Sequence, residues 1–372
     1  MMFQARFALA AAMVVMGAGL TARGAELAKG TPDLKSAGAL AFGPDGVLFI
    51  GDAQGGAIFA VDTQDRTPAS PGGTFQVEAI NEKVAALLGT EPGQVMINDL
   101  AVSPASGKAY LSASRGRGQD ATPVIVRVDR SGKLEAVDLK EIPFAKAALA
   151  HLPDASPATP APAPAKKARP SARSQAITDL AYLDGRVYVA GLSNEQFASR
   201  LVSLPYPFTG KEEATSVEIY HGAHGAFETR SPIRTFAAYS IKGEPHLMAA
   251  YTCTPLVKVP VAALKPGSHF KGQTIAELGN MNTPLDMIVY QKGGKDYLLM
   301  ANTARGVMKI STDGIDKAAS ITDRIAKTAG QPYETVADLK NVMQLDGLDK
   351  DNALILVQRP SGSMDLETVP LP

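Results

Sequence analysis

Polar side chains recur at the starts and ends of predicted strands, and their types suit a hard cation or a hydrogen-bonding ligand. They are Asn98, Asp99, Asp179, Arg234, Asp286 and Gln344 at strand starts, and Asp52, Asn194, Thr252, Asn302 and Arg359 at strand ends. Carboxylate and amide oxygens are the ligands that calcium takes in proteins. The same groups also form hydrogen bonds and ion pairs. If the strand starts meet in space, these residues predict one shared polar site.

Two interpretations of the acidic residues stay open. Asp99, Asp179 and Asp286 cannot lie close together unpaired unless a cation or a proton is shared among them. A calcium ion would be held by Asn98, Asp99, Asp179 and Asp286. In the other interpretation, Arg234 and Arg359 neutralise the carboxylates and the site is a salt-bridged, water-filled channel.

The histidines and the cysteine give a weaker indication of chemistry. His221 and His224 form the only local histidine pair, but the glycines around them predict a loop, and two histidines alone are an incomplete metal site. Cys253 is the single cysteine, so the chain forms no internal disulfide. The count also excludes a Cys-rich zinc site and a CxxCH haem site. We interpret Cys253 as a small buried residue near a strand end.

The common catalytic sequence motifs are absent. The chain contains neither GxSxG nor HExxH, and it has no P-loop and no dinucleotide-binding glycine loop. Whether the protein is an enzyme therefore stays open at this level. The 37 basic residues balance the 37 acidic residues, and a near-neutral chain argues against nucleic acid as the main partner.

An internal repeat predicts the elements that must position these residues. Each repeat has a weakly polar first strand, a turn with Asp, Gly, Asn or Lys, an apolar second strand and a third strand of alternating character. The units are 38–62, 98–129, 178–205, 233–261, 285–311 and 342–371. A fourth, outer strand is predicted after most units, and four antiparallel strands repeated radially form a β-propeller. The sequence predicts an all-β fold with six blades, with seven as the alternative.

The predicted outer strands and short helices complete this scheme. Outer strands are expected at 75–80, 133–139, 216–220, 273–278 and 321–325, and helices at 81–89, 144–152 and 333–340. The sixth unit reaches the C-terminus after three strands. A strand within 26–36 is therefore predicted to supply the fourth, so that N-terminal and C-terminal strands pair and close the ring.

Two segments lie outside the repeat. Residues 1–24 combine Arg6, an apolar run and small residues, which predicts a cleaved signal peptide and a secreted or periplasmic protein. Residues 25–372 then form a single propeller domain. The segment 151–175 is rich in Pro and Ala without an apolar period, so it is predicted to be an insertion. No later apolar stretch reaches about 18 residues, so no membrane span is expected after cleavage.

The pattern resembles a known family of secreted proteins. Asn98-Asp99, standing before a strand and a glycine-containing turn, is similar to the calcium-binding motif of six-bladed lactonases of the gluconolactonase/regucalcin and paraoxonase-like type. Asp179 and Asp286 match the motif less closely. The resemblance implies a propeller fold, a calcium ion in the channel and hydrolysis of a lactone or ester.

The chain also departs from that family. The family has a Glu at the start of its first inner strand, where this chain has Ser36-Ala-Gly-Ala39. The Asn-Gly motif of a middle blade is replaced by Thr178-Asp179-Leu180. A shared fold does not by itself imply shared function.

Two functions follow from these observations. In the first, the propeller binds a small ligand or a partner protein on the face that carries its loops. In the alternative, it is a calcium-dependent lactone or ester hydrolase, in which the ion in the central channel polarises a carbonyl.

Overall fold

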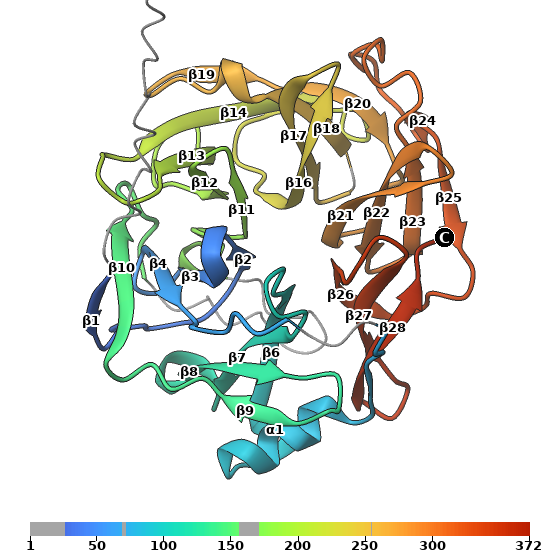
Figure 1. Cartoon of the computed structure of the whole chain (residues 1–372). Coiled ribbons are helices and arrows are strands. Elements are labelled where there is room, and N and C mark those ends of the chain that lie inside the picture. The colour runs from blue at the N-terminus through green and yellow to red at the C-terminus, as the bar shows by residue number, and fades with distance from the viewer. Residues whose placement is uncertain (1–26, 69–71, 156–170, 254) are drawn as a thin grey trace, which may run out of the picture.

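A computed structural model describes residues 27–68, 72–155, 171–253 and 255–372. The predicted signal peptide (1–24) and part of the Pro/Ala-rich insertion lie outside the described residues. The described chain forms six β-sheets arranged radially around a central axis (Figure 1). The predicted all-β propeller with six blades is confirmed.

The blades are numbered here by the chain order of their inner strands. Blade 1 contains β2 (Leu40–Phe42), β3 (Val47–Asp52), β4 (Ala57–Asp62), β10 (Ile142–Ala148) and β1 (Ala28–Gly30). Blade 2 contains β6 (Val95–Val102), β7 (Ala109–Arg115), β8 (Thr122–Val128) and β9 (Leu134–Ala136). Blade 3 contains β11 (Asp179–Leu183), β12 (Arg186–Leu192), β13 (Ser199–Pro205), β14 (Glu213–His221) and β15 (Ala226–Glu228), with β19 (His269–Lys271) paired to β14.

The second half of the chain builds the other blades. Blade 4 contains β16 (Ile233–Ile241), β17 (Glu244–Tyr251), β18 (Pro255–Pro260), β20 (Gln273–Glu277) and β24 (Ala329–Gly330). Blade 5 contains β21 (Pro284–Lys292), β22 (Lys295–Asn302), β23 (Gly306–Ser311) and β25 (Tyr333–Val336). Blade 6 contains β26 (Val342–Gly347), β27 (Asn352–Gln358), β28 (Met364–Pro370) and β5 (Gln76–Val77).

The first three strands of every blade lie where the repeat predicts them. The second strands are apolar because both of their faces are covered by neighbouring blades. All six residues of β3 are buried, for example, and so are all but the ends of β27. An ordinary half-exposed strand would alternate instead.

The blades do not follow one another around the ring in chain order. The inner strands are adjacent in the order β6, β2, β11, β16, β21, β26, and β26 contacts β6 again. Blade 2 therefore lies between blades 6 and 1, and blade 1 lies between blades 2 and 3. Figure 1 shows this exchange, because β2 stands between β11 and β6.

Apolar clusters between neighbouring blades stabilise this order. Phe49 and Ile58 of blade 1 share a buried cluster with Val189 of blade 3, and Leu111 of blade 2 shares one with Leu354 of blade 6. Gly51 permits the contact between blades 1 and 3, because a Cβ atom there would lie 2.8 Å from Ile177 Cγ2.

The ring is closed by an early strand, but not by the segment predicted. The outer strand of blade 6 is β5, which pairs with β28 in the register Val77 to Leu366. The predicted segment 26–36 contributes only β1, which pairs with β10 at the outer edge of blade 1. Because blade 2 lies between blades 6 and 1, the chain passes the edge of blade 6 on its way from blade 1 to blade 2.

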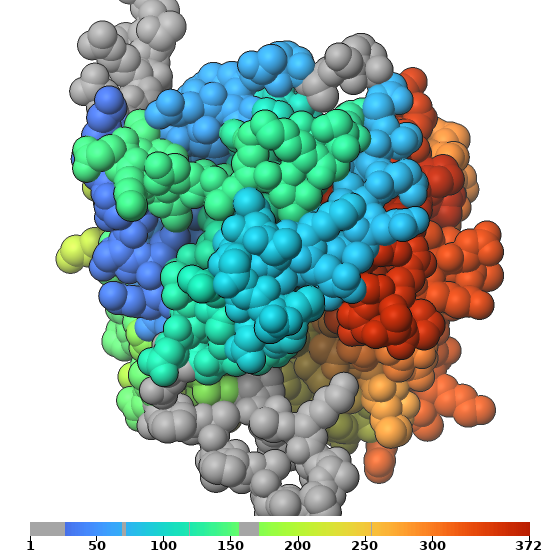
Figure 2. Space-filling view, turned by 90° about the horizontal axis from the view of Figure 1, so that it is seen from below, coloured from blue at the N-terminus to red at the C-terminus, as the bar shows by residue number. Residues whose placement is uncertain are grey.

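The outer elements contain the remaining corrections. The strand predicted at 75–80 belongs to blade 6 rather than blade 1, and the outer strand of blade 5 is β25 rather than 321–325. The helix predicted at 81–89 is α1 (Ile80–Leu88), which lies against blade 6 and blade 2 (Figure 2). The helices predicted at 144–152 and 333–340 are wrong, because pairing with β4 and β23 outweighs helix propensity there.

Two further local features complete the description. Short 3-10 helices lie at Pro44–Gly46, Pro92–Gln94, Gly118–Asp120, Arg173–Gln175 and Val261–Ala263. No helix among the described residues is long and apolar enough to cross a membrane.

Candidate functional site

Three aspartates lie at matching positions at the starts of inner strands. Asp99 pairs with Ser112 of the second strand of its blade. In the same way, Asp179 pairs with Ala190 and Asp286 pairs with Ala301. The matching residues of the other three blades are Ala39, whose carbonyl accepts from the Gly51 N–H, Thr235 and Gln344. Because blades 1 and 2 are exchanged, the acidic blades alternate with the non-acidic blades around the axis. The three carboxylates therefore approach the channel with approximate threefold spacing.

Each of these carboxylates joins two neighbouring blades. Asp99 accepts hydrogen bonds from the Leu100 N–H of its own strand (2.9 Å) and from the Leu40 N–H of blade 1 (2.7 Å). Asp179 accepts from Leu180 and Phe236, and Asp286 accepts from Met287 and Leu345, in the same way. Both oxygens of each carboxylate are thus held by backbone donors.

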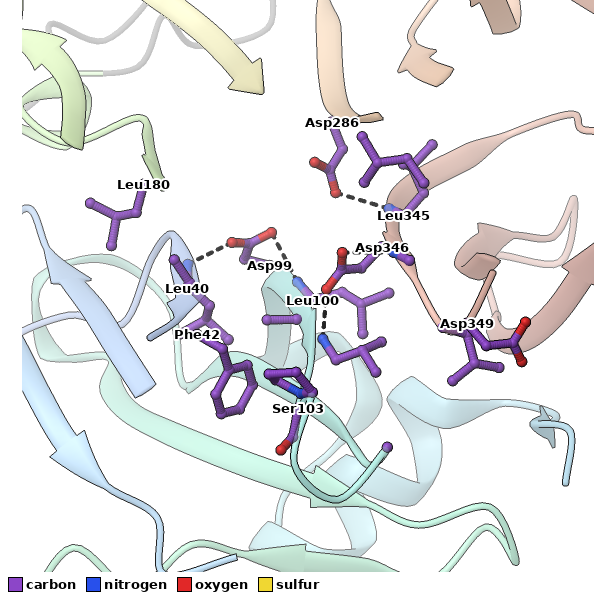
Figure 3. A pocket seen from close by; sticks show the side chains of 18 of the residues that line it. Leu40, Phe42, Asp99, Leu100, Ser103, Leu180, Asp286, Leu345, Asp346 and Asp349 are labelled. Atoms are coloured by element: carbon purple, nitrogen blue, oxygen red, sulfur yellow. Dashed lines mark hydrogen bonds between the residues drawn. The ribbon is translucent and has the colours of Figure 1, made fainter. Parts of the chain in front are cut away.

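A fourth carboxylate, two residues further along its inner strand, is held in the same way. Asp346 lies on β26, two residues beyond Gln344, and accepts from the Gly347 N–H and from the Val102 N–H of blade 2, each at 2.7 Å. Figure 3 shows Asp99, Asp286 and Asp346 gathered around one space. Asp346 was not among the site residues predicted from the sequence, although its place near the start of the sixth inner strand was a usable signal.

Irregularities in the inner strands help to aim these side chains. The register of β6 shifts between Ile97 and Asp99, and that of β21 shifts between Pro284 and Asp286. A β-bulge of this kind bends its strand and redirects the side chains beside it. The extra residue on β6 is Asn98, which donates to the Ala37 carbonyl of blade 1 at 2.8 Å.

The four aspartates line one cavity of about 750 Å³. The cavity runs from the carboxylates along the inner strands to the turns that join first and second strands, such as Ser103–Gly107. Those turns lie on the face opposite the loops between second and third strands. Asp349 and Arg130 also line the cavity, and Arg130 is the one basic residue among its described lining.

The environment raises the pKa of all four carboxyl groups. Burial in the ring raises the pKa of Asp179 and of Asp346 to about 6, although backbone hydrogen bonds partly oppose this. Burial, together with the charges of neighbouring aspartates, raises the pKa of Asp99 and Asp286 well above the usual range. The cluster therefore binds protons more readily than exposed aspartates do when no cation is bound.

The two arginines predicted to neutralise the acids do not do so. Arg359 lies on blade 6 and pairs with Asp365 (2.5 Å) and Glu367 of the same sheet. Burial lowers the pKa of Arg234, and its Nε has no hydrogen-bond partner among the described residues. None of the ion pairs formed within the described chain involves the four channel aspartates.

Other predicted site residues have structural partners. Asp52 is buried and accepts from the backbone of Lys35, Ser36 and Gly55, so it fixes the turn after β3. Asn302 accepts from the Arg305 N–H at 2.9 Å and fixes the matching turn in blade 5. Asn194 is exposed in the turn after β12. These three residues do not join the aspartates in the cavity.

The predicted calcium ligands do not form a compact cage. Among the described residues, the one group of three His, Cys, Asp or Glu ligand atoms within 4.8 Å of one another is His221, His224 and Cys253. The channel carboxylates are held apart because each accepts a hydrogen bond from a backbone N–H of the next blade. An ion in direct contact with three of them does not fit this arrangement.

The histidine–cysteine group brings together residues that lie far apart in the sequence. His221 is the last residue of β14, His224 lies in the turn to β15, and Cys253 follows β17 on the neighbouring blade. The sequence could not show this contact, since it depends on how blades 3 and 4 pack.

Comparisons with known proteins find similar folds among solved structures but no family. No family model and no curated protein matches the chain. Solved structures with similar folds include the PQQ-bound aldose sugar dehydrogenase of Streptomyces coelicolor, at 14% identity over 93% of this chain and 96% of that chain, with a TM-score of 0.38. A putative glucose dehydrogenase of Thermus thermophilus is also 14% identical, over 93% and 99% of the two chains, with a TM-score of 0.35.

A putative gluconolactonase is similar at 11% identity over 93% of this chain and 91% of that chain, with a TM-score of 0.34. At these identities the likeness concerns the fold alone. The six blades of the structure are what the predicted resemblance to gluconolactonase-type propellers implies for the fold.

Proposed function

We propose that this β-propeller binds a small, positively charged ligand in the acidic cavity of its channel. The observation that carries the proposal is the convergence of Asp99, Asp179, Asp286 and Asp346 on one cavity, where no basic side chain of the described chain is paired to them. Among the described residues, five acidic and one basic line that space, so its potential favours a cation.

The carboxylates have capacity left for a ligand. Each oxygen of an ionised carboxylate offers two lone-pair sites, and the backbone N–H groups occupy about half of them. An ammonium group entering the cavity would donate to the remaining sites. It would also favour the ionised carboxylates, so binding should release protons from the cluster. The backbone donors keep the acids in place before the ligand arrives.

An exported location is a second part of the proposal. It rests on the signal-like segment 1–24. Expression of the full chain with a C-terminal tag should yield a shortened protein in the extracellular or periplasmic fraction. Recovery of the uncleaved chain inside the cell would contradict it.

The test of the ligand proposal uses 1,4-diaminobutane as a probe. We expect calorimetric titration of the wild-type protein to show saturable binding, with a heat that varies with the ionisation enthalpy of the buffer because protons are released. Asp286→Asn and Asp346→Asn should each weaken binding at least about tenfold, since each removes a charge next to the ligand. Asp33→Asn, which alters only an exposed pair with Lys146, should bind as the wild type does.

Two parallel titrations separate this proposal from its competitors. Calcium tests the hydrolase interpretation, and sorbitol tests an uncharged ligand that is rich in hydroxyl groups. Saturable calcium binding that is lost in Asp99→Asn, without binding of the diamine, would favour the hydrolase interpretation and overturn the proposal. Equal affinity of wild type and Asp286→Asn for the diamine would place the binding outside the cavity.

A further inference from the structure

A second cluster of chemically active residues lies away from the channel, where blades 3 and 4 meet. The hairpin from β14 to β15 carries His221, His224 and Glu228, and the turn after β17 carries Cys253. The backbone fixes this turn in place, since the Cys253 N–H donates to the Asn282 carbonyl at 2.7 Å. Both elements lie on the face that carries the loops between second and third strands.

Glu228 orients both histidine rings. Its Oε1 lies 2.9 Å from His221 Nδ1 and 2.5 Å from His224 Nδ1, and Ser231 donates to its Oε2. A carboxylate accepts hydrogen bonds, so this geometry directs the Nδ1–H of each ring to Glu228. The Nε2 atom of each neutral imidazole then carries the lone pair.

The Nε2 atom of His221 is available for a ligand. His221 is 2% exposed, and its Nε2 is buried without a hydrogen-bond partner among the described residues. The two imidazole rings lie side by side, with centroids 4.0 Å apart. A buried nitrogen lone pair without a partner costs free energy unless something binds to it.

Cys253 completes a group of three. One ligand atom each from His221, His224 and Cys253 can be chosen so that all three lie within 4.8 Å of one another. A cavity of about 380 Å³ adjoins them and is also lined by Glu228, Arg230 and Thr252. Three protein ligands beside such a cavity leave a fourth position for water or an exogenous molecule.

We propose that His221, His224 and Cys253 bind a borderline or soft transition-metal ion, zinc or copper. Imidazole nitrogen with thiolate sulfur is a ligand set for these metals, whereas calcium and magnesium take oxygen. A carboxylate that holds the far nitrogen of a ligating histidine is the usual outer support of such sites, and here Glu228 supports two. Binding forms a metal–sulfur bond and releases the thiol proton to the solvent.

A cysteine nucleophile activated by a histidine is the competing interpretation of the same residues. That chemistry needs one imidazole beside the thiol and one group that orients it. It gives no role to the second imidazole, which Glu228 orients in the same manner. Two imidazoles gathered with one thiol therefore favour a metal, and the nucleophile becomes an outcome of the test.

The test uses the full mature chain, reduced and freed of metal with a chelator. We expect one equivalent of Zn²⁺ to bind and to raise the melting temperature. Co²⁺ should bind at the same site and give a thiolate-to-cobalt charge-transfer band in the near ultraviolet, which Zn²⁺ should abolish. A Cu²⁺ titration followed by electron paramagnetic resonance decides which of the two metals binds more tightly.

Variants assign the ligands. Cys253→Ser should lose the charge-transfer band, and His224→Ala should weaken Zn²⁺ binding at least about a hundredfold. Because His224 is exposed, its replacement should not prevent folding. Glu228→Gln should keep the band but weaken binding about 10- to 100-fold, as expected for a residue that positions the ligands. His151→Ala changes an exposed histidine elsewhere and should behave as the wild type does.

Two results would overturn the proposal. The first is the absence of stoichiometric Zn²⁺ or Co²⁺ binding to the folded wild type, or binding that Cys253→Ser and His224→Ala both retain. The second is rapid alkylation of Cys253 by iodoacetamide that depends on His224 and is not slowed by Zn²⁺. That result would assign the cluster to thiol chemistry. Neither result bears on the channel aspartates, whose titration with the diamine is independent.

Discussion

At the scale of single residues, each channel aspartate connects two neighbouring blades by hydrogen bonds. Each accepts one N–H from its own strand and one from the next blade, so removing a carboxylate leaves a buried backbone donor without its partner. Such a loss costs about 1–3 kcal/mol. Asparagine repairs it only in part, because its amide nitrogen cannot accept a hydrogen bond. The same side chains thus serve stability and the proposed binding site.

The raised pKa values of these residues predict an unusual pH dependence of stability. An aspartate titrates near 3.9 in the unfolded chain, whereas the pKa values of Asp179 and Asp346 are about 6 in the folded state. The folded state therefore binds more protons between about pH 4 and 6, and its stability falls as the pH rises through this window. Carboxyl groups with lowered pKa, such as Glu228, lose their stabilising effect only below about pH 4.

We expect the melting temperature of the metal-free and ligand-free protein to rise when the pH is lowered from about 7.5 to about 5. Melting curves at constant ionic strength measure it. The double variant Asp179→Asn/Asp346→Asn should be less stable than the wild type at pH 5, yet it should show a flatter dependence on pH. Asp33→Asn should keep the wild-type slope. A melting temperature that falls on acidification through this range would show that the cluster is ionised in the folded protein.

At the scale of elements, the outer strands decide how the ring closes. β5 is short, but the residues around it are well anchored. Phe75 is fully buried, its N–H donates to Thr368 Oγ1, and its carbonyl accepts from the Thr368 N–H. Asn81 of α1 accepts from the Met364 N–H on the same strand of blade 6. By contrast, Ala28 and Lys29 of β1 are exposed.

These contacts predict opposite outcomes for two changes near the N-terminus. Phe75→Ala should destabilise the protein by about 3–5 kcal/mol, because it empties a core position at the closure of blade 6. Deleting Ala28–Gly30 should cost less than about 1 kcal/mol, because it removes only an outer edge. Chemical denaturation of both variants measures the difference. A larger loss from the deletion than from Phe75→Ala would show that closure depends on β1.

At the scale of the whole molecule, the exchange of blades 1 and 2 makes the ring interdependent. β10 returns from blade 2 to complete blade 1, and β5 leaves blade 1 to complete blade 6. Blades 1, 2 and 6 therefore share strands as well as apolar clusters. Alternate placement of Asp99, Asp179 and Asp286 around the channel also depends on this exchange. In a ring that followed chain order, Asp99 and Asp179 would lie on adjacent blades.

Shared strands predict one cooperative unfolding transition. The chain has no tryptophan, and its buried tyrosines include Tyr110, Tyr188, Tyr251 and Tyr290 on four different blades. Tyrosine fluorescence and far-ultraviolet circular dichroism should therefore give coincident melting curves. Separate transitions would show that some blades unfold independently, which the shared strands β5 and β10 should prevent.

The sequence by itself determined the repeat, the six blades and the first three strands of each blade, because strand alternation and turn residues are local signals. It also placed Asp99, Asp179 and Asp286 at equivalent positions on inner strands. Tertiary structure decided which blades are neighbours, since outer strands such as β5 and β10 are chosen by contacts between distant segments. Only these contacts bring Asp346 to the same cavity, direct each carboxylate to a backbone N–H of the next blade and place Cys253 beside His221 and His224.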